Sequence, residues 1–254
     1  MKQIAFISGA TSGIGEAISE MFAQNNIDII ITGRRKERLE ILKQRIESNS
    51  ESKVYCLNFD VRNNDEVCKA VDSLPEELKN NIEILVNNAG LASGLEPIQE
   101  GNLEDWEKMI DTNIKGLLYL TRKISPILQK NKKGHIINIG SIAGKEVYSN
   151  GNVYCATKHA VDALTKAMRI DLLPFNIKVT QIAPGMTDTE FSTVRFHGDK
   201  QRADNVYKGL EPLIAKDIAE IALFVVNRKN YVCINDIVVT PTAQANATSV
   251  FRKN

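Results

Sequence analysis

The segment Ser8-Gly9-Ala10-Thr11-Ser12-Gly13-Ile14-Gly15 decides the fold. It joins a short apolar run at residues 4–8 to a stretch at residues 13–24 whose apolar side chains recur at helical spacing. Its glycines let the backbone turn sharply and approach a ligand without a Cβ atom in the way. The start of the following helix offers free N–H groups and a positive dipole end to an anion. The segment therefore predicts a strand–turn–helix unit that binds a phosphate group, and a tight turn that binds nothing is the alternative.

The alternation of strand and helix continues along the whole chain. Short apolar runs separated by longer amphipathic stretches predict parallel strands joined by crossover helices, and near-continuous apolar runs are typical of strands buried on both faces. The predicted strands are residues 4–8, 27–32, 54–58, 82–86, 135–139, 178–182 and 234–239. The predicted helices include residues 13–24, 36–46, 153–172 and 217–226. We expect an α/β fold in which a doubly wound parallel sheet of about seven strands is flanked by helices.

We predict a single domain over residues 1–254, because no Pro-rich or Ser-rich linker, repeat or low-complexity segment divides the chain. One stretch interrupts the rhythm. Residues 185–209 contain no clear strand, and polar residues break their apolar pattern. A long excursion in a compact domain is often a functional lid, and a solvated surface insertion is the alternative.

The composition is that of an ordinary globular protein, with 43% hydrophobic and 25% charged residues. A net charge of +1 gives no overall field that would attract nucleic acid or an anionic membrane. No apolar stretch approaches the roughly 20 residues needed to span a bilayer, and the N-terminal run is too short for a signal peptide. The four cysteines, at positions 56, 68, 155 and 233, are widely spaced and form no C-x-x-C pair. We therefore expect a reduced, cytoplasmic protein.

The end of the second predicted strand bears on the ligand of the glycine-rich turn. Sites for NAD place an acidic residue about 20 residues after the glycines, where it bonds to the ribose 2′-OH. Here the strand ends in Thr32-Gly33-Arg34-Arg35, with no Asp or Glu. Guanidinium groups suit a 2′-phosphate, so we predict NADP rather than NAD. A solvated helix start is the alternative, and it applies more to Arg35 than to Arg34.

Tyr154 and Lys158 stand at positions i and i+4, on one face of a predicted helix. Ser141 follows the predicted strand 135–139, at the edge where open parallel sheets bind ligands. When an alcohol is oxidised, a nicotinamide takes the hydride but the protein must handle the proton. The reference pKa of tyrosine is about 10, and the Lys158 ammonium with a cationic nicotinamide would lower the pKa of Tyr154. The Ser141 hydroxyl can hold the substrate oxygen.

With these features the chain resembles the short-chain dehydrogenase/reductase family over essentially its whole length. The matching segments, in the family's order, are residues 8–15, Asp60-Val61, Asn87-Asn88-Ala89-Gly90, Asn113, Ser141, Tyr154 with Lys158, and Pro184-Gly185. Ser8 stands where the family usually has Thr, and serine keeps the hydroxyl group. The resemblance implies a Rossmann-type fold and hydride transfer between NADP and an alcohol/carbonyl pair.

The resemblance also implies roles for individual residues. The implied catalytic residues are Asn113, Ser141, Tyr154 and Lys158, and Asn113 would complete a proton relay through water and the lysine. Asp60 would meet the adenine, Asn87 would steady the central sheet, and Pro184-Gly185 would lie against the nicotinamide. The expected cofactor-binding residues are Gly9, Thr11, Ser12, Gly13, Ile14, Gly15, Arg34, Arg35, Asp60, Val61, Asn87, Ala89, Gly90, Tyr154, Lys158, Pro184, Gly185 and Thr187.

A narrower resemblance concerns residues 85–91, 111–113, 134–141 and 189–196, which are similar to a bacterial and yeast branch of the family. That branch comprises NADP-dependent 3-hydroxy acid dehydrogenases, some of which are described as malonic semialdehyde reductases. It implies small substrates such as serine, L-allo-threonine or 3-hydroxypropionate, held by Ser141 and Tyr154. Arg195, in the lid-like excursion, can bind a substrate carboxylate through two parallel hydrogen bonds. The alternative is that Arg195 attaches the lid to the body of the protein or to another subunit.

Two other functions remain open. One is a broad ketone, steroid or acyl-carrier ketone reductase, although Thr240-Pro241-Thr242-Ala243-Gln244 lacks the glycine-rich segment usual in acyl-carrier reductases. The other is an NADP-sensing protein without turnover, against which the intact catalytic set argues.

The remaining expectations concern metals and partners. The three histidines show no metal-ligand spacing, so we expect no metal. Small residues permit close approach of helices, and family members are often tetramers, so we expect a homotetramer. The row that suggests it is Ala156, Ala160, Ala163 and Ala167, and packing of this row against its own sheet is the alternative.

Overall fold

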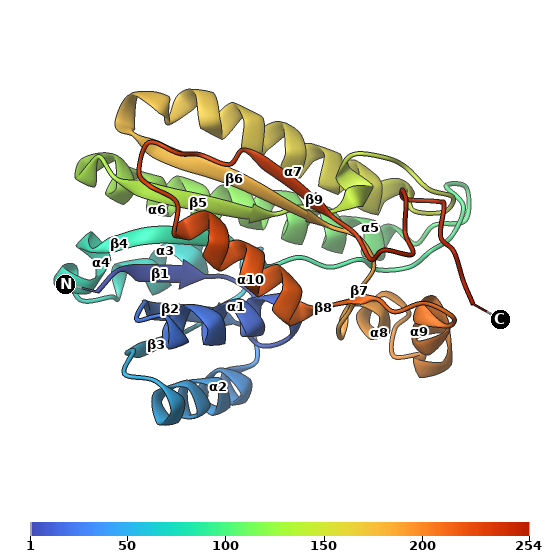
Figure 1. Ribbon diagram of the computed structural model, residues 1–254, viewed down its shortest axis with the longest axis horizontal. Helices are drawn as coiled ribbons and strands as arrows, with labels where there is room; N and C mark the ends of the chain where they lie inside the picture. Colours follow the sequence, from blue (N-terminus) through green and yellow to red (C-terminus); the bar gives the residue numbers. More distant parts are fainter. Residues whose placement is uncertain (1, 254) are drawn as a thin grey trace.

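The computed structural model describes residues 2–253 and places strand β1 (Ile4–Ile7) in the interior of a parallel sheet, between β2 and β4. The strand order is β3-β2-β1-β4-β5-β6-β9, and all neighbours run parallel (Figure 1). The other strands are β2 (Asp28–Gly33), β3 (Val54–Asn58), β4 (Ile82–Asn87), β5 (Gly134–Ile139), β6 (Ile177–Pro184) and β9 (Asp236–Val239). Each matches one predicted run to within two residues at either end. The predicted doubly wound sheet of about seven strands is confirmed.

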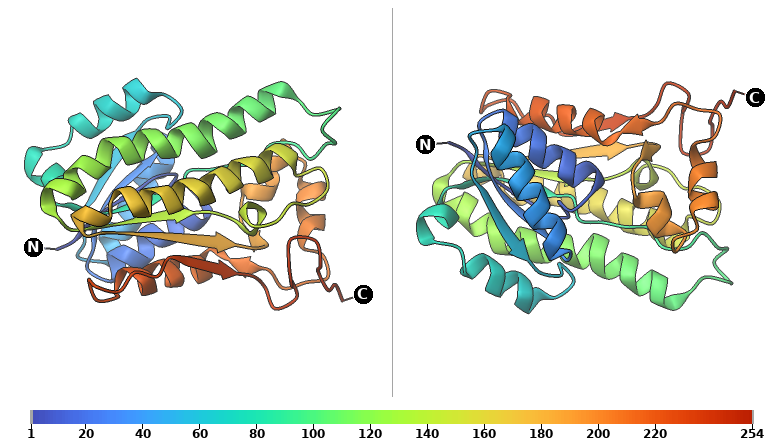
Figure 2. Two further views of the ribbon diagram at one scale, coloured as in Figure 1. Left: turned by 90° about the horizontal axis from the view of Figure 1, so that it is seen from above. Right: turned by 90° about the horizontal axis from the view of Figure 1, so that it is seen from below.

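Helices cover both faces of the sheet, as the views from above and below show (Figure 2). One face is covered by α1 (Gly13–Gln24), α2 (Lys36–Asn49) and α10 (Ala215–Val226). The other is covered by α3 (Asn64–Asp72), α4 (Glu76–Asn80), α6 (Leu117–Asn131) and α7 (Asn152–Asp171). A core of buried aliphatic side chains fills each interface, because the strands are apolar on both sides.

The strand order reverses between β1 and β4, and this reversal creates the cleft. The helix that follows β1 packs on one face, whereas the helices that follow β4 pack on the other. The two connecting loops therefore diverge at the carboxyl ends of these strands, where ligands bind in open α/β sheets. On the far side of the cleft, α5 (Leu103–Ile110) runs through a π-helical turn, η1 (Asp111–Gly116), into α6.

The chain leaves the sheet after β6 and forms a small unit beyond the strand ends, visible with α8 and α9 in Figure 1. A two-residue strand β7 (Thr187–Asp188) pairs in parallel with β8 (Leu213–Ile214). Between them lie α8 (Phe191–Arg195) and α9 (Lys200–Tyr207). The sequence predicted no strand here, because two residues are too short to produce an apolar run. We call residues 187–214 the lid segment.

The long helix α7 settles one alternative left open by the sequence. Its side toward the sheet is formed by buried residues that include Thr157, Val161, Thr165 and Met168. Of the alanine row, Ala156, Ala163 and Ala167 are exposed and Ala160 is half-buried. Packing of this row against its own sheet is therefore not observed. No helix in the described part of the chain combines the length and the apolar character that crossing a membrane requires.

Candidate active site

A cavity of about 670 Å³ opens where the strand order reverses, a size typical of sites for small molecules. Its walls come from the turn after β1, the ends of β2, β4, β5 and β6, and the lid segment. The predicted site residues that line it are Gly9, Thr11, Ser12, Gly13, Ile14, Arg34, Arg35, Asp60, Val61, Ala89, Gly90, Ser141, Tyr154, Lys158, Pro184, Gly185, Thr187 and Arg195. Three predicted residues, Gly15, Asn87 and Asn113, lie behind this lining.

The glycine-rich turn is shaped for close approach by a ligand. Gly9 has a φ of +66°, and a Cβ atom there would lie 2.8 Å from the Cα atom of Ala89 at the end of β4. Gly15 packs against the carbonyl oxygen of Gly9, so only a glycine fits behind the turn. The Ser12 side chain does not cap α1, which leaves the first N–H groups of that helix for an anion.

Ser8 joins β1 to β4 through its hydroxyl. The Oγ atom accepts hydrogen bonds from the N–H groups of Asn88 and Ala89 at 3.0 and 3.1 Å, and it donates to the Val86 carbonyl. The Asn88 amide in turn donates to the carbonyls of Ser8 and Gly9, each at 3.0 Å. Asn88 is thus a site residue that sequence reasoning did not select, since its position beside Asn87 gave no separate signal.

Asn87 belongs to a buried polar network inside the sheet. Its amide donates to Thr121 Oγ1 at 3.0 Å and to Asn138 Oδ1 at 2.9 Å, and its side chain is almost fully buried. Asn138 donates to Thr165 Oγ1 on α7. The network ties β4 and β5 to α6 and α7, so Asn87 influences the cavity through the sheet and not from its lining.

The end of β2 provides positive charge and no carboxylate. The Arg34 side chain is exposed, and its nearest carboxylate oxygen, on Asp60, is 3.9 Å away. Asp60 is held by Arg62, which donates two short hydrogen bonds to Oδ2. Burial opposes ionisation of Asp60, but the bonds from Arg62 outweigh it and lower the pKa. Arg34 therefore fits a 2′-phosphate, because its guanidinium is exposed and its ion pair with Asp60 is a long one, without a hydrogen bond.

Ser141, Tyr154 and Lys158 meet at the carboxyl end of β5. Ser141 caps the 3₁₀ turn η2 (Ile142–Gly144), and its Oγ atom accepts the Ala143 N–H at 3.1 Å. The Lys158 ammonium donates to the Ile139 carbonyl at 2.9 Å, and the Tyr154 phenol lines the same cavity as Ser141. Tyr154 and Lys158 are both buried side chains of α7.

Burial dominates the acid–base properties of this group. It lowers the pKa of Lys158 to about 8. It also raises the pKa of Tyr154, against the hydrogen bond from Ser141 and the charge of Arg195. We expected Lys158 and a bound cationic nicotinamide to lower the pKa of Tyr154. The protein groups alone do not lower it, because burial disfavours the charged phenolate.

Asn113 lies in the π-helical turn, a deformation that is frequent at functional sites. Its amide donates to the Leu91 carbonyl at 2.8 Å and to Thr157 Oγ1 at 3.0 Å, while Oδ1 accepts the Leu91 N–H at 2.9 Å. The side chain thus fastens the helix to the loop after β4 and to α7. Both of its N–H groups are occupied, so its side chain holds the site in place from behind.

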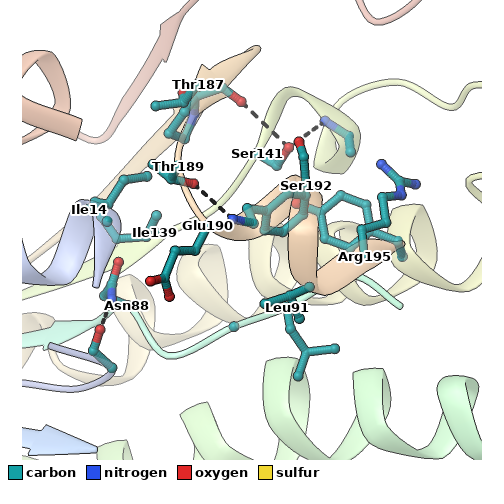
Figure 3. A pocket seen from close by; sticks show the side chains of 18 of the residues that line it. Ile14, Asn88, Leu91, Ile139, Ser141, Thr187, Thr189, Glu190, Ser192 and Arg195 are labelled. Carbon is teal, nitrogen blue, oxygen red and sulfur yellow. Dashed lines mark hydrogen bonds between the residues drawn. The ribbon is translucent and has the colours of Figure 1, made fainter. Parts of the chain in front are cut away.

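Arg195 faces the cavity from the lid segment, near Ser141 and Ser192 (Figure 3). Its Nη2 atom donates to the Tyr148 hydroxyl at 2.8 Å and its Nε atom to the Gly94 carbonyl at 3.3 Å. The guanidinium carbon lies 5.4 and 5.5 Å from the ring centroids of Tyr148 and Tyr154. Within residues 2–253 it forms no ion pair with a carboxylate. The contacts of Arg195 are therefore compatible with both roles predicted from the sequence, attachment of the lid and binding of a substrate carboxylate.

Several lining residues were missed because nothing in the sequence marks them. Tyr207 donates to the Thr187 carbonyl at 2.8 Å and shares a hydrogen bond of 2.8 Å with Ser192. Gln244, from the C-terminal segment, accepts the Met186 N–H at 2.8 Å. These side chains come from segments without regular periodicity, so only the folded chain brings them together.

Comparison with known proteins identifies the family. Residues 3–200 match the family model described as short chain dehydrogenase. The chain is 42% identical to an NADP-dependent 3-hydroxy acid dehydrogenase of Schizosaccharomyces pombe over 248 residues, 97% of this chain and 95% of that protein. It is 44% identical to the NADP-dependent 3-hydroxy acid dehydrogenase YdfG of Escherichia coli K12 over 245 residues, 96% of this chain and 97% of that protein.

A solved structure, the closed form of a serine dehydrogenase complexed with NADP+, superposes with a TM-score of 0.93 at 43% identity, covering 99% of this chain and 100% of that one. The two sequence matches cover 96–97% of this chain and the superposition covers 99% of it. The chain therefore belongs to the short-chain dehydrogenase family, whose members are oxidoreductases.

Proposed function

We propose that this protein is an NADP-dependent oxidoreductase that interconverts the hydroxyl group of a small 3-hydroxy acid and the corresponding carbonyl. Serine, L-allo-threonine and 3-hydroxypropionate are the substrates to examine first. The similarity of the chain to two NADP-dependent 3-hydroxy acid dehydrogenases and to a serine dehydrogenase supports this substrate class. The end of β2 is followed by Arg34 and Arg35, with no Asp or Glu at the position where NAD sites place an acidic residue, and this supports NADP over NAD.

One observation carries the substrate assignment. The half-buried guanidinium of Arg195 lies 5.5 Å from the Tyr154 ring centroid and has no acidic partner among the described residues. Such a group favours an anion, because guanidinium and carboxylate form strong paired hydrogen bonds. In a 3-hydroxy acid the hydroxyl and the carboxylate are two carbons apart. The hydroxyl can therefore lie against Ser141 and Tyr154 while the carboxylate meets Arg195.

The chemistry follows from these positions. NADP, when bound, supplies the hydride acceptor or donor. The hydroxyls of Ser141 and Tyr154 hold the substrate oxygen, and the Tyr154 phenol accepts the substrate proton in oxidation or donates it in reduction. Lys158, buried one helical turn away, stabilises the phenolate by its charge. The turn after β1 and the start of α1 would hold the pyrophosphate, and Arg34 with Arg35 the 2′-phosphate.

The test compares an acid with its neutral counterpart. The kcat/KM with NADP is measured for 3-hydroxypropionate and for its amide in the wild type and in Arg195→Met. We expect the acid to lose about 10- to 100-fold while the amide changes little, because a hydrogen bond to a charged group is worth about 1.5–3 kcal/mol. Arg202→Met is the matched control, since Arg202 belongs to the same lid segment and stacks on Phe196 but does not itself line the cavity. Equal losses for acid and amide would remove the carboxylate role.

We also propose a cytoplasmic homotetramer. The exposed alanine row of α7 supports close contact with a second copy, because small side chains let helices approach closely. The molar mass in solution, measured by light scattering, tests the assembly. Leucine substitutions at Ala163 and Ala167 should lower that mass if the row lies in the contact.

A further inference from the structure

We call the part of the cavity lined by the turn after β1 and the end of β2 its coenzyme end, and the part lined by Ser141, Tyr154 and Arg195 its substrate end. One carboxylate, that of Glu190, joins the lid segment to the coenzyme end. Glu190 Oε2 accepts a hydrogen bond from Arg35 Nη1 at 2.9 Å, and Oε1 accepts one from Arg38 Nη1 at 2.6 Å. Figure 3 shows Glu190 on the side of Ile14 and Asn88, away from Arg195. This contact therefore lies at the phosphate-binding turn and not at the substrate end.

The Glu190 carboxylate is charged at neutral pH. Burial opposes its ionisation, but the hydrogen bonds from Arg38 and Arg35 outweigh burial and lower its pKa. Its side chain is 45% exposed, so water and salt moderate the pair. Glu190 thus places a negative charge directly beside Arg35, just after β2, and Arg38 in α2.

The Arg35 guanidinium has its other N–H groups on the glycine-rich turn. Nε donates to Thr11 Oγ1 at 3.1 Å, and Nη2 donates to Ser12 Oγ at 2.8 Å. These acceptors are neutral hydroxyls, whereas Glu190 carries the same sign of charge as a phosphate. A 2′-phosphate that binds Arg35 must therefore share the guanidinium with Glu190 or displace it, and two anions on one cation repel each other even in water.

We propose that Glu190 competes with the 2′-phosphate of NADP for Arg35 and thereby sets the affinity for the coenzyme. In the free protein Glu190 neutralises Arg35 and Arg38 and fastens the lid segment to the turn after β1. The 2′-phosphate replaces this internal anion, so part of the binding energy of NADP is used to release Glu190. The inference rests on the coenzyme assignment of the proposed function but not on the substrate.

Two adenosine ligands that differ only in the 2′-phosphate isolate this effect. Dissociation constants of 2′,5′-ADP and 5′-ADP are measured by titration calorimetry for the wild type and for Glu190→Gln. Neither ligand carries a nicotinamide, so the catalytic group is not involved. We expect Glu190→Gln to bind 2′,5′-ADP about fivefold more tightly and 5′-ADP as the wild type does, as removal of one partly exposed ion pair predicts.

Two further variants separate the pair from a general effect of charge. Glu37→Gln removes an exposed carboxylate of α2 that forms no ion pair in the described part of the chain, and we expect less than about a twofold change. In an Arg35→Gln background, Glu190→Gln should no longer improve binding of 2′,5′-ADP, because the shared cation is gone. Thermal unfolding of each variant checks that the fold is intact.

The outcomes are distinct. Unchanged or weaker binding of 2′,5′-ADP to Glu190→Gln, an equal change for both ligands, or an effect that persists without Arg35 overturns the competition. A wild type that binds both ligands equally overturns the coenzyme assignment and this inference with it. A wild-type preference for 2′,5′-ADP without any effect of Glu190 overturns the inference alone.

Discussion

The two ends of the cavity are built differently. At the coenzyme end, Ser8 and Asn87 are buried and join neighbouring strands through hydrogen bonds of 2.9–3.2 Å. At the substrate end, the lid segment has two-residue strands and is attached by side chains such as Arg195 and His197. The hydrogen bonds at the coenzyme end fix backbone positions, whereas the side-chain contacts at the substrate end can each be broken without disturbing the others. We therefore expect the sheet to fix the geometry of the bound coenzyme and the lid segment to determine substrate choice, with Glu190 as the contact through which the lid segment also affects coenzyme affinity.

Tyr154 is where the two ends meet, so Tyr154→Phe should have the largest effect. Its helix packs on the sheet, and its ring contacts the lid segment through Phe191, with centroids 5.6 Å apart. Removing only the phenolic oxygen keeps both packing contacts but removes the proposed proton acceptor. We expect kcat to fall about 10²- to 10⁴-fold, with NADPH affinity nearly unchanged.

Turnover and NADPH fluorescence titration measure these two quantities. Tyr148→Phe is the control, since it removes the hydroxyl that holds Arg195 at 2.8 Å but leaves the proton acceptor in place. For that variant we expect mainly a higher KM for acids. A Tyr154→Phe enzyme that kept more than about a tenth of the wild-type kcat would contradict the assigned role.

The same substitution at one glycine in each region compares their rigidity directly. Gly9 has a φ of +66° and its added Cβ would lie 2.8 Å from the Cα atom of Ala89 in the loop after β4, whereas Gly198 has a φ of +92° and nothing within 4 Å. Both alanines adopt an unfavourable positive φ, but only Gly9→Ala must also displace neighbouring backbone. We expect urea unfolding to show losses of about 3 kcal/mol for Gly9→Ala and about 1 kcal/mol for Gly198→Ala. Equal losses would mean that the coenzyme end is no more rigid than the lid.

The sequence predicted the sheet well for a physical reason. Each strand is buried on both faces, as in β1, so it must be apolar throughout and is visible as a run. The glycines of residues 8–15 and the pair Tyr154 and Lys158 also follow from local geometry, a tight turn and one helix face. Such features depend on neighbours in the chain, and one sequence is enough to recognise them.

The rest of the site depends on contacts between distant segments. Arg35 and Glu190 are joined across the cleft, and Arg195 meets Tyr148 from another loop. Hydrophobic periodicity carries no information about such pairs. The sequence could therefore locate the lid segment but not the residues that it contacts. The effect of burial on the pKa of Tyr154 could not be predicted for the same reason, because desolvation is set by the whole surrounding structure.

A buried histidine gives the sheet its own response to acid. His135 on β5 is 4% exposed, and burial, with a smaller contribution from Lys178, lowers its pKa to about 3. The unfolded chain, with a histidine pKa near 6.5, binds more protons between these values, so stability falls as the pH drops below about 6.5. We expect a loss of about 2 kcal/mol between about pH 6.5 and 5 from this residue.

Urea unfolding at several pH values measures that loss in the wild type and in His135→Gln. The variant should have a flatter acid limb, because the group that must be charged on unfolding is gone. His159→Gln, at an exposed position of α7, serves as the control and should keep the wild-type slope. Identical slopes for the wild type and His135→Gln would show that other groups dominate the response.

The lid contact of His197 should have the smallest effect and the most local one. Its Nε2 atom lies 3.0 Å from Asp105 Oδ2, and Asp105 Oδ1 also accepts the Ser93 hydroxyl at 2.6 Å. The His197 side chain is 58% exposed, so solvent limits the pair to less than about 1 kcal/mol. In His197→Gln the Ser93 bond and the backbone bond from Gly94 to Arg195 remain, and the global unfolding free energy should hardly change.

The effect of His197→Gln should instead appear as faster hydrogen exchange of lid amides at residues 196–210 and as a KM for acids raised about two- to threefold. The dissociation constant of NADPH should stay at the wild-type value, because no hydrogen bond of the turn after β1 involves His197 in the described residues. If loosening His197 weakened NADPH binding as much as it raised the KM for acids, the two ends of the cavity would be one cooperative unit. Coenzyme geometry and substrate choice could then not be assigned to separate regions, since a single opening step would control both.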